Sequence, residues 1–149
     1  VLLNKEKFNY NLGIKLVTDG TDNHMMVANT IASFKIDGTT AEKTLDKAGI
    51  AVNKQVIPDD PNPPYRPSGI RIGTPALTTR GMREQEMEYI AGLIHTALKN
   101  HDNDNLLSQM KNHMRVSLKI VSFVGHKVSS LTRIILEEMD KKLAAWIVT

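Results

Sequence analysis

The segment "IPDDPNPPYRPSGIRIGTPALTTRG" (residues 57–81) decides how the chain can fold. Five of the six prolines in the protein fall within ten consecutive residues at its start. Because proline lacks a backbone donor and disfavours helix in the residue before it, we predict an extended, stiff loop here. "GIRIG" (69–73) then indicates a short strand, and Thr74 and Pro75 are typical of a helix N-cap and a first helical position. Gly81 is expected to end that short helix.

Three further strands are predicted upstream of the proline-rich loop. "IKLVTDG" (14–20) and "HMMVAN" (24–29) lie on either side of "DGTDN", a run of turn-forming residues. A short strand is also expected at 50–53, directly before the loop. The sheet should therefore be built from the first half of the chain.

A helix is predicted between these strands, in "TTAEKTLDKAGI" (39–50). Thr39 and Glu42 have the spacing of a capping box, in which each side chain bonds the backbone of the other residue. Apolar residues share one face of the segment, and Gly49 is a typical helix terminator.

Helical periodicity dominates the rest of the chain. Apolar residues recur at helical spacing from Met82 to about Lys99, and "NHDNDN" (100–105) ends this helix. Two more helices are predicted, at roughly 104–121 and 127–147. The last carries an apolar stripe made of Val128, Leu131, Ile135, Met139, Leu143 and Trp146. A small sheet followed by helices predicts the α+β class.

Composition narrows the classes of protein to consider. With 149 residues the chain has the size of one domain, and 41% hydrophobic and 23% charged residues are ordinary for a globular protein. No apolar run approaches the roughly 18–20 residues that span a bilayer, and the first residues do not resemble a signal peptide. The chain has no cysteine, which excludes disulfides and thiolate sites and fits a cytoplasmic protein.

The positive charge of the chain does not indicate a nucleic-acid partner. The formal net charge is +3, but acidic residues are interleaved with the basic ones throughout, as in "REQEMEY" (83–89) and "LEEMDKK" (136–142). No run of Lys or Arg occurs, and aromatic residues make up only 5% of the chain. We therefore expect neither a nucleic acid nor a membrane as partner.

Arg71, in the middle of "GIRIG", is the residue whose chemistry most needs an explanation. A guanidinium can make two parallel hydrogen bonds to a carboxylate, and flanking glycines let a ligand approach the backbone closely. The competing interpretation is an arginine on an edge strand that forms a salt bridge. The residues alone favour the salt bridge.

The other candidate residues give weaker signals. His95 and His101 are six residues apart, which does not place them on one helical face, so we predict no metal site. His24 lies beside a tight turn. A functional role and a hydrogen bond to local backbone are equally good interpretations of it. Asp59 and Asp60 could form a carboxylate pair, although neighbours in an extended loop usually point apart into solvent. No phosphate-binding glycine loop and no nucleophile elbow is present.

Three motifs together resemble one family. "LVTDGTDNHMM", "AEKTLDKAGIAVNKQVIPDDP" and "SGIRIGTPALTTRG" are similar, in order and spacing, to the C-terminal domain of serine hydroxymethyltransferase. The resemblance extends from about Lys15 to about Asn112. It implies a small, mostly antiparallel sheet packed by helices, as in the C-terminal domain of fold-type I pyridoxal-phosphate enzymes. Extra helices would follow this domain.

The resemblance also implies an activity. The family interconverts serine and glycine and transfers a one-carbon unit to tetrahydrofolate, with pyridoxal phosphate as cofactor. Its large domain carries the cofactor lysine after a run of threonines and a histidine, and no "TTTHK" motif occurs in this chain. We therefore expect the chain alone to be inactive and to need a large catalytic domain. A homo-oligomer is possible, because the family is dimeric.

Site residues follow from the same resemblance. The arginine of GIRIG binds the α-carboxylate of the substrate in the family, and this position is Arg71. The last residue of the family's VNKN motif lies near the folate, and here it is Gln55. Arg80 matches a basic position that supports the site, and Asn53 and His24 match structural residues near the domain junction.

The ends of the chain depart from the family pattern. We expect a divergent segment at 1–13, a serine hydroxymethyltransferase-like domain at 14–121 and an unmatched helical extension at 122–149. An alternative function is a non-catalytic module for protein association, which would use the apolar stripe at 128–146 as a partner helix. For the stripe itself, packing against its own domain is the favoured interpretation.

Overall fold

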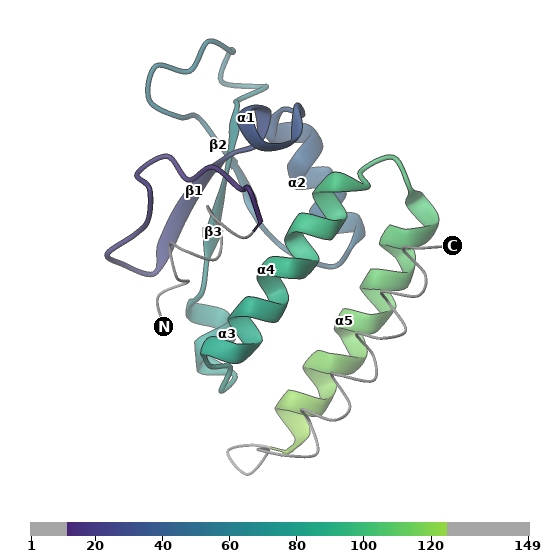
Figure 1. The fold of residues 1–149 in the computed structure, drawn as a ribbon. Helices are drawn as coiled ribbons and strands as arrows, with labels where there is room; N and C mark the ends of the chain where they lie inside the picture. Colours follow the sequence, from purple (N-terminus) through teal and green to yellow (C-terminus); the bar gives the residue numbers. More distant parts are fainter. Residues whose placement is uncertain (1–11, 125–149) are drawn as a thin grey trace.

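The computed structural model of the chain describes residues 12–124 (Figure 1). The α+β prediction is confirmed, because a three-stranded antiparallel sheet packs against helices. The strand order is β1-β3-β2, so the third strand in sequence is the middle strand of the sheet. In chain order the elements are β1 (Met25–Asn29), α1 (Thr30–Phe34), α2 (Gly38–Lys47), β2 (Asn53–Gln55), β3 (Gly69–Gly73), α3 (Pro75–Thr79), α4 (Glu84–Lys99) and α5 (Asp104–Val124).

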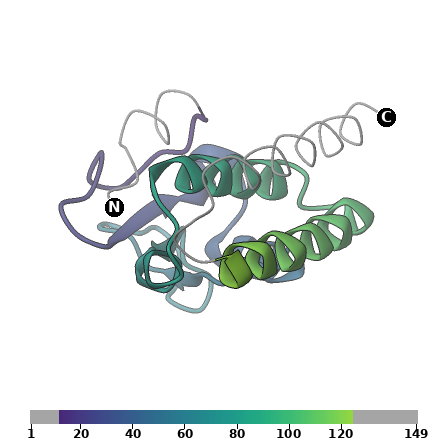
Figure 2. The same ribbon diagram turned by 90° about the horizontal axis from the view of Figure 1, so that it is seen from below.

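One hydrophobic core joins the sheet to the helices. On β3, Ile70 and Ile72 are buried, and they lie opposite the buried Ala28 and Met26 of β1. Helices α2, α4 and α5 contact one another and contribute most of the rest of the core. Figure 2 shows α4 and α5 on the same side of the sheet. The other face of the sheet remains outside this core, and Arg71 lies on it.

The proline-rich segment at 56–68, here called the proline loop, is held against the start of α2. The Gly38 N–H donates to the Pro67 carbonyl at 2.6 Å, and the Thr39 hydroxyl donates to the Tyr65 carbonyl at 3.0 Å. A Cβ atom on Gly38 would lie 2.1 Å from the Gly69 carbonyl oxygen. The two backbones are therefore in direct contact, and only glycine fits at position 38.

Helix α2 begins earlier than its sequence pattern predicts. Its N-cap is Asp37, whose carboxylate accepts from the Thr40 N–H at 2.7 Å and from the Arg66 guanidinium at 2.7 and 3.0 Å. Partial burial would raise the Asp37 pKa, but these hydrogen bonds outweigh it, and the pKa is lowered. The predicted capping box is wrong, because Thr39 bonds the proline loop and Glu42 accepts from the Lys54 N–H at 3.0 Å.

The strand predicted at 50–53 is displaced to Asn53–Gln55. Gly49 has φ +82°, as expected of a helix terminator, and the Ile50 N–H bonds back to the Leu45 carbonyl at 2.8 Å. These are the contacts of a Schellman motif, which uses the amide of Ile50 to close the helix. Pairing with β3 can begin only a few residues later.

The strand predicted at 14–20 is reduced to a single bridge between Leu16 and Ala28. A turn at Val17 and Thr18 follows the bridge; the Thr18 hydroxyl donates to the Gly20 carbonyl, and Asp19 adopts a left-handed φ of 54°. The strand predicted at 24–29 is confirmed apart from its first residue. The short helix α1 after it was not predicted.

The remaining predictions agree with the structure to within a few residues. The strand at 69–73 is confirmed, and Pro75 occupies the first turn of α3. Thr74 precedes that helix without a side-chain cap, since its hydroxyl lies 3.5 Å from the His24 carbonyl instead. Helix α4 begins two residues later than predicted, and α5 ends three residues later than predicted. The helix predicted at 127–147 lies outside the described residues.

No helix within 12–124 has both the length and the apolar character that a membrane crossing requires.

Asp60 organises the inside of the proline loop. Its Oδ2 accepts from the backbone N–H groups of Ile57 at 3.2 Å and Ser68 at 2.9 Å. Its Oδ1 accepts from the Asn62 N–H at 3.0 Å and the Ser68 hydroxyl at 2.6 Å. Partial burial alone would raise the pKa of Asp60, but the four hydrogen bonds lower it to about 2.

We predict that Asp60→Asn lowers the free energy of unfolding by about 2 kcal/mol, because an amide group cannot accept from every donor around it. Urea unfolding at neutral pH measures this loss. Asp59→Asn is the matched control: Asp59 is exposed and has φ +52°, which asparagine tolerates, so its unfolding should be unchanged. Equal losses in both variants would contradict the role of Asp60.

The same carboxylate predicts acid sensitivity. The Asp60 pKa is about 2 in the folded chain against an ordinary value of 3.8, so its stabilisation is present above pH 4. It should be lost as the pH falls from about 4 to about 2. Comparing urea unfolding of the wild type and Asp60→Asn over this range should show their stability difference shrinking toward zero.

We predict that Gly38→Ala destabilises the fold by about 3 kcal/mol, because its methyl group would overlap a backbone oxygen. Gly92, in the middle of α4, is the control, since a Cβ atom there would meet no atom within 4 Å. Gly92→Ala should stabilise the chain by about 0.5–1 kcal/mol through its helix propensity. Thermal unfolding followed by circular dichroism measures both changes, and similar values for the two variants would refute the prediction.

Candidate functional site

Arg71 projects from the middle strand of the sheet, away from the core. Its neighbours Ile70 and Ile72 are buried, and strand alternation places Arg71 on the opposite face, where it is exposed. It pairs with Val27 of β1 on one side and with Asn53 of β2 on the other. The strand that carries Arg71 is therefore fixed from both sides.

The salt-bridge interpretation of Arg71 is not supported. β3 is the middle strand of the three, so the arginine is not on an edge. The Arg71 side chain forms no hydrogen bond or ion pair with any residue between 12 and 124 whose side chain the structure describes. Its guanidinium group is thus free to bind a ligand from outside this part of the chain.

The two glycines beside Arg71 have different tasks. A Cβ atom on Gly73 would lie in ordinary contact with Pro75 at 3.7 Å and with the His24 carbonyl oxygen at 3.8 Å, so a side chain could be placed there without overlap. A Cβ atom on Gly69 would lie 2.7 Å from Ile57 and 2.9 Å from the Ala28 carbonyl oxygen. Gly69 is therefore required by packing of the proline loop, whereas packing does not require glycine at position 73.

Gln55 and Asn53 share the outward face with Arg71. Asn53 lies directly opposite Arg71, and Gln55 lies opposite Gly69, two positions away on the same face. Gln55 is half-buried, and its side-chain amide donates to the Val56 carbonyl at 3.2 Å. This bond leaves the side-chain oxygen of Gln55 available as an acceptor. The structure thus brings together three of the residues singled out in the sequence.

His24 and Arg80 lie around α3, toward the Gly73 end of β3. The His24 carbonyl accepts from the Thr74 N–H at 3.1 Å, which ties the start of β1 to the start of α3. The His24 side chain is exposed. Arg80 is the C-cap of α3 and is exposed too. Within 12–124, no hydrogen bond or ion pair joins either side chain to Arg71, Asn53 or Gln55.

Asp59 and Asp60 do not form a catalytic pair. All the hydrogen bonds of Asp60 hold the loop, and the expectation that it is a solvated loop charge is wrong, because it is half-buried. Asp59 is exposed, as expected. These two carboxylates are therefore not arranged as a pair for proton transfer.

The histidines of the described residues do not form a metal site. No cluster of three or more His, Asp or Glu ligands occurs in the part of the chain from 12 to 124. His95 packs near Phe34 with ring centres 5.8 Å apart, and burial lowers its pKa, helped by the nearby charge of Lys99. In the turn between α4 and α5, the His101 Nε2 atom lies 3.3 Å from the Asp102 Oδ1 atom.

The sequence interpretation missed the structural roles of three residues. Asp37 and Asp60 both hold the proline loop, and each carries a local signal: Asp37 precedes Gly-Thr-Thr as an N-cap, and Asp60 bonds the amide two residues ahead as an Asx turn. His113 of α5 is buried and hydrogen-bonded to the hydroxyl of Tyr89 on α4. No sequence signal joins that pair, because its members are 24 residues apart.

Comparison with known proteins agrees with this arrangement of motifs. A family model described as serine hydroxymethyltransferase matches residues 3–94, which is more than half of the chain. The serine hydroxymethyltransferase of Acidobacterium capsulatum is 52% identical over 98 residues, which cover 66% of this chain and 23% of that protein. The chain thus spans about a quarter of the length of this curated relative. On this match, the chain belongs to the serine hydroxymethyltransferase family.

Proposed function

We propose that this chain supplies the substrate-carboxylate surface of a cytoplasmic serine hydroxymethyltransferase. The parent reaction interconverts serine and glycine and passes the one-carbon unit to tetrahydrofolate. The observation that carries the proposal is Arg71: an exposed guanidinium on the middle strand, without a hydrogen-bond or ion-pair partner among residues 12–124. The named relative is a serine hydroxymethyltransferase, which supports the same reaction.

The role of Arg71 is to orient the amino acid. A guanidinium holds a carboxylate through two parallel hydrogen bonds, which fix both its position and its plane. Because β3 pairs with β1 and β2, the arginine is carried by a strand that cannot shift toward either side. Holding the substrate in one orientation is a contribution to catalysis in its own right.

Gln55 gives this face a second polar group, at the side of β2. We propose that its carboxamide lies near the folate, with Arg71 at the amino-acid end of the same surface. Asn53 lies between them and directly opposite Arg71. Arg80 and His24 support the surface from the region around α3.

The outward face of the sheet does not itself fit pyridoxal phosphate. The family's cofactor requires a lysine, and the outward positions carry none; they are Met25, Val27 and Asn29 of β1, Asn53 and Gln55 of β2, and Gly69, Arg71 and Gly73 of β3. We propose that a larger domain, outside this chain, holds the cofactor, which acts as an electron sink when bound. The isolated chain is then inactive, and the active assembly, a homo-oligomer in this proposal, contains both parts.

The domain limits are proposed as the sequence predicts them, and the family match from residue 3 reaches into the first of these segments. We place the serine hydroxymethyltransferase-like domain at 14–121, a divergent segment at 1–13 and a family-unlike extension at 122–149. The association module, our alternative, depends on the stripe at 128–146, which lies outside the described residues.

A chimera tests the role of Arg71. Residues 3–94 of this chain would replace the matching segment of the Acidobacterium capsulatum enzyme. We expect the chimera to convert serine, and Arg71→Lys to lower kcat/KM for serine about 30- to 700-fold. That range corresponds to about 2–4 kcal/mol for a lost bidentate, charge-assisted contact.

Arg83→Lys is the matched control in the same chimera. Arg83 is also exposed, at the start of α4, but it lies away from the outward face of the sheet. This variant should keep kcat/KM within about twofold of the parent. If Arg71→Lys behaves like Arg83→Lys, the carboxylate role of Arg71 is wrong.

The absence of a cofactor lysine predicts a simple spectroscopic result. Pyridoxal phosphate added to the 149-residue chain at one equivalent should give no lysine-bound absorbance band that a single substitution removes. The A. capsulatum enzyme, treated in the same way, is the positive control. A stoichiometric band abolished by one Lys→Ala substitution in this chain would show that it holds the cofactor itself.

A further inference from the structure

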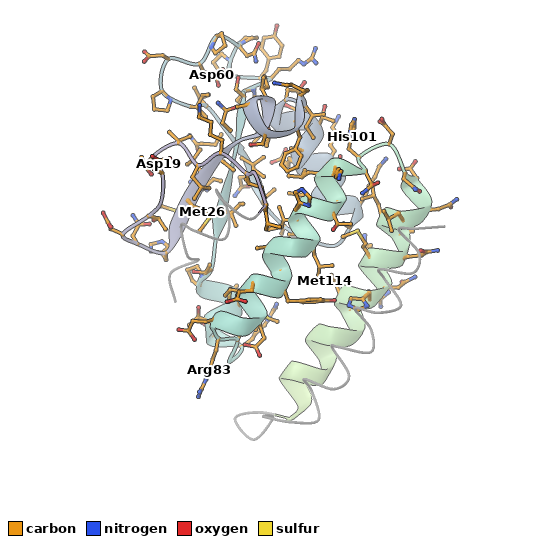
Figure 3. The ribbon with its side chains drawn as sticks, in the orientation of Figure 1. Asp19, Met26, Asp60, Arg83, His101 and Met114 are labelled. Carbon is orange, nitrogen blue, oxygen red and sulfur yellow. The ribbon has the colours of Figure 1, made fainter. Side chains whose placement is uncertain are left out.

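We propose that Asp60 is a positioning residue, which sets where Gln55 lies relative to Arg71. The proposal rests on the proposed function for its consequences, but its structural part can be tested without any activity. Figure 3 labels Asp60 within the proline loop, at the opposite end of the view from Arg83 at the start of α4.

Asp60 joins the two ends of the proline loop through one oxygen atom. Its Oδ2 accepts from the Ile57 N–H at 3.2 Å and from the Ser68 N–H at 2.9 Å. Ile57 comes two residues after Gln55, the last residue of β2, and Ser68 comes one residue before Gly69, the first residue of β3. The exit of one strand and the entry of the next are thus held on a single carboxylate.

The composition of the loop explains why this role falls to a side chain. Five prolines remove five backbone donors from residues 58–67, so the loop cannot close with a ladder of backbone hydrogen bonds. Of the donors that remain, the N–H groups of Ile57, Asn62 and Ser68 all point to Asp60. A carboxylate has enough acceptor sites for all of them and for the Ser68 hydroxyl.

The two strands depend on Asp60 to different degrees. β3 pairs with both neighbours, along five residues with β1 and along three with β2, so its place is determined without the loop. β2 has three residues and pairs only with β3. Its other anchors are Glu42, which accepts from the Lys54 N–H, and the Lys54 ammonium group, 3.4 Å from the Tyr65 carbonyl. Releasing the loop end should therefore move Gln55 more than Arg71.

Hydrogen exchange on the 149-residue chain tests the structural part. In Asp60→Asn we expect the β2 amides to exchange at least about 10-fold faster relative to the β1 amides than they do in the wild type. Leu107→Ala, which removes a buried side chain of α5 and lowers stability without touching the loop, should leave this ratio unchanged. If Asp60→Asn speeds exchange equally in β1 and β2, as Leu107→Ala does, the proposal is overturned.

Steady-state kinetics in the chimera test the consequence for function. We expect Asp60→Asn to raise KM for tetrahydrofolate about 10-fold and KM for serine less than about twofold, because only the β2 side of the surface moves. Arg71→Lys should do the opposite and raise KM for serine more than KM for tetrahydrofolate. Asp59→Asn should change neither constant. Parallel changes in both constants for Asp60→Asn would refute a positioning role.

Ser68→Ala keeps the test open if Asp60→Asn does not fold. It removes one of the four hydrogen bonds to Asp60 and leaves both bonds to Oδ2 in place. The same split is expected in smaller form, with KM for tetrahydrofolate rising about threefold. If KM for tetrahydrofolate rises no more than KM for serine in Ser68→Ala, the proposal is contradicted. Failure of the proposed function looks different: the chimera is inactive or insensitive to Arg71→Lys, while hydrogen exchange still reports on Asp60.

Discussion

The backbone contact between Gly38 and the residues before β3 is the constraint on which the rest of the structure depends. The Gly38 N–H bonds the Pro67 carbonyl, and the space beside Gly38 is filled by the Gly69 carbonyl oxygen. On one side of this contact, the Asp37 carboxylate caps α2. On the other side, it accepts a hydrogen bond from the Arg66 guanidinium. The first turn of α2 therefore determines where β3 enters the sheet. Since β3 is the middle strand, it also determines the position of Arg71.

A second constraint follows from the donors that the proline loop lacks. A loop with so few N–H groups cannot stabilise itself through its backbone, and this chain uses two aspartates instead. Asp37 holds the loop to the helix from outside, and Asp60 holds it together from inside. Both carboxylates have lowered pKa values because hydrogen bonds to their charged forms outweigh the effect of burial. The result is a stiff connection between the two strands that carry the candidate site.

Sequence reasoning predicted the elements better than their ends. The strand at 69–73 and the helix-terminating glycine at Gly49 followed from local chemistry and are confirmed. The failures arose where tertiary contacts take over a local group: the Thr39 hydroxyl and the Glu42 carboxylate bond other segments instead of closing a capping box. β2 was predicted too early in the sequence, at 50–53, because the Ile50 amide closes the helix. Local patterns cannot reveal such competition between partners.

The sequence proposes the residues of the candidate site but does not specify their geometry. Arg71 on its own looked like a salt-bridge residue, and the family resemblance reversed that interpretation. That Arg71, Asn53 and Gln55 share one face depends on the register between β2 and β3, which no residue pattern specifies.

The bond from the Lys54 amide to Glu42 has a consequence of another kind. An edge strand invites a foreign strand to join it, and here a charged side chain already occupies that amide. At the other edge, residues 15–17 cover β1 through bonds to Val27 and Asn29. The small sheet is thereby protected at both borders against growing into an aggregate.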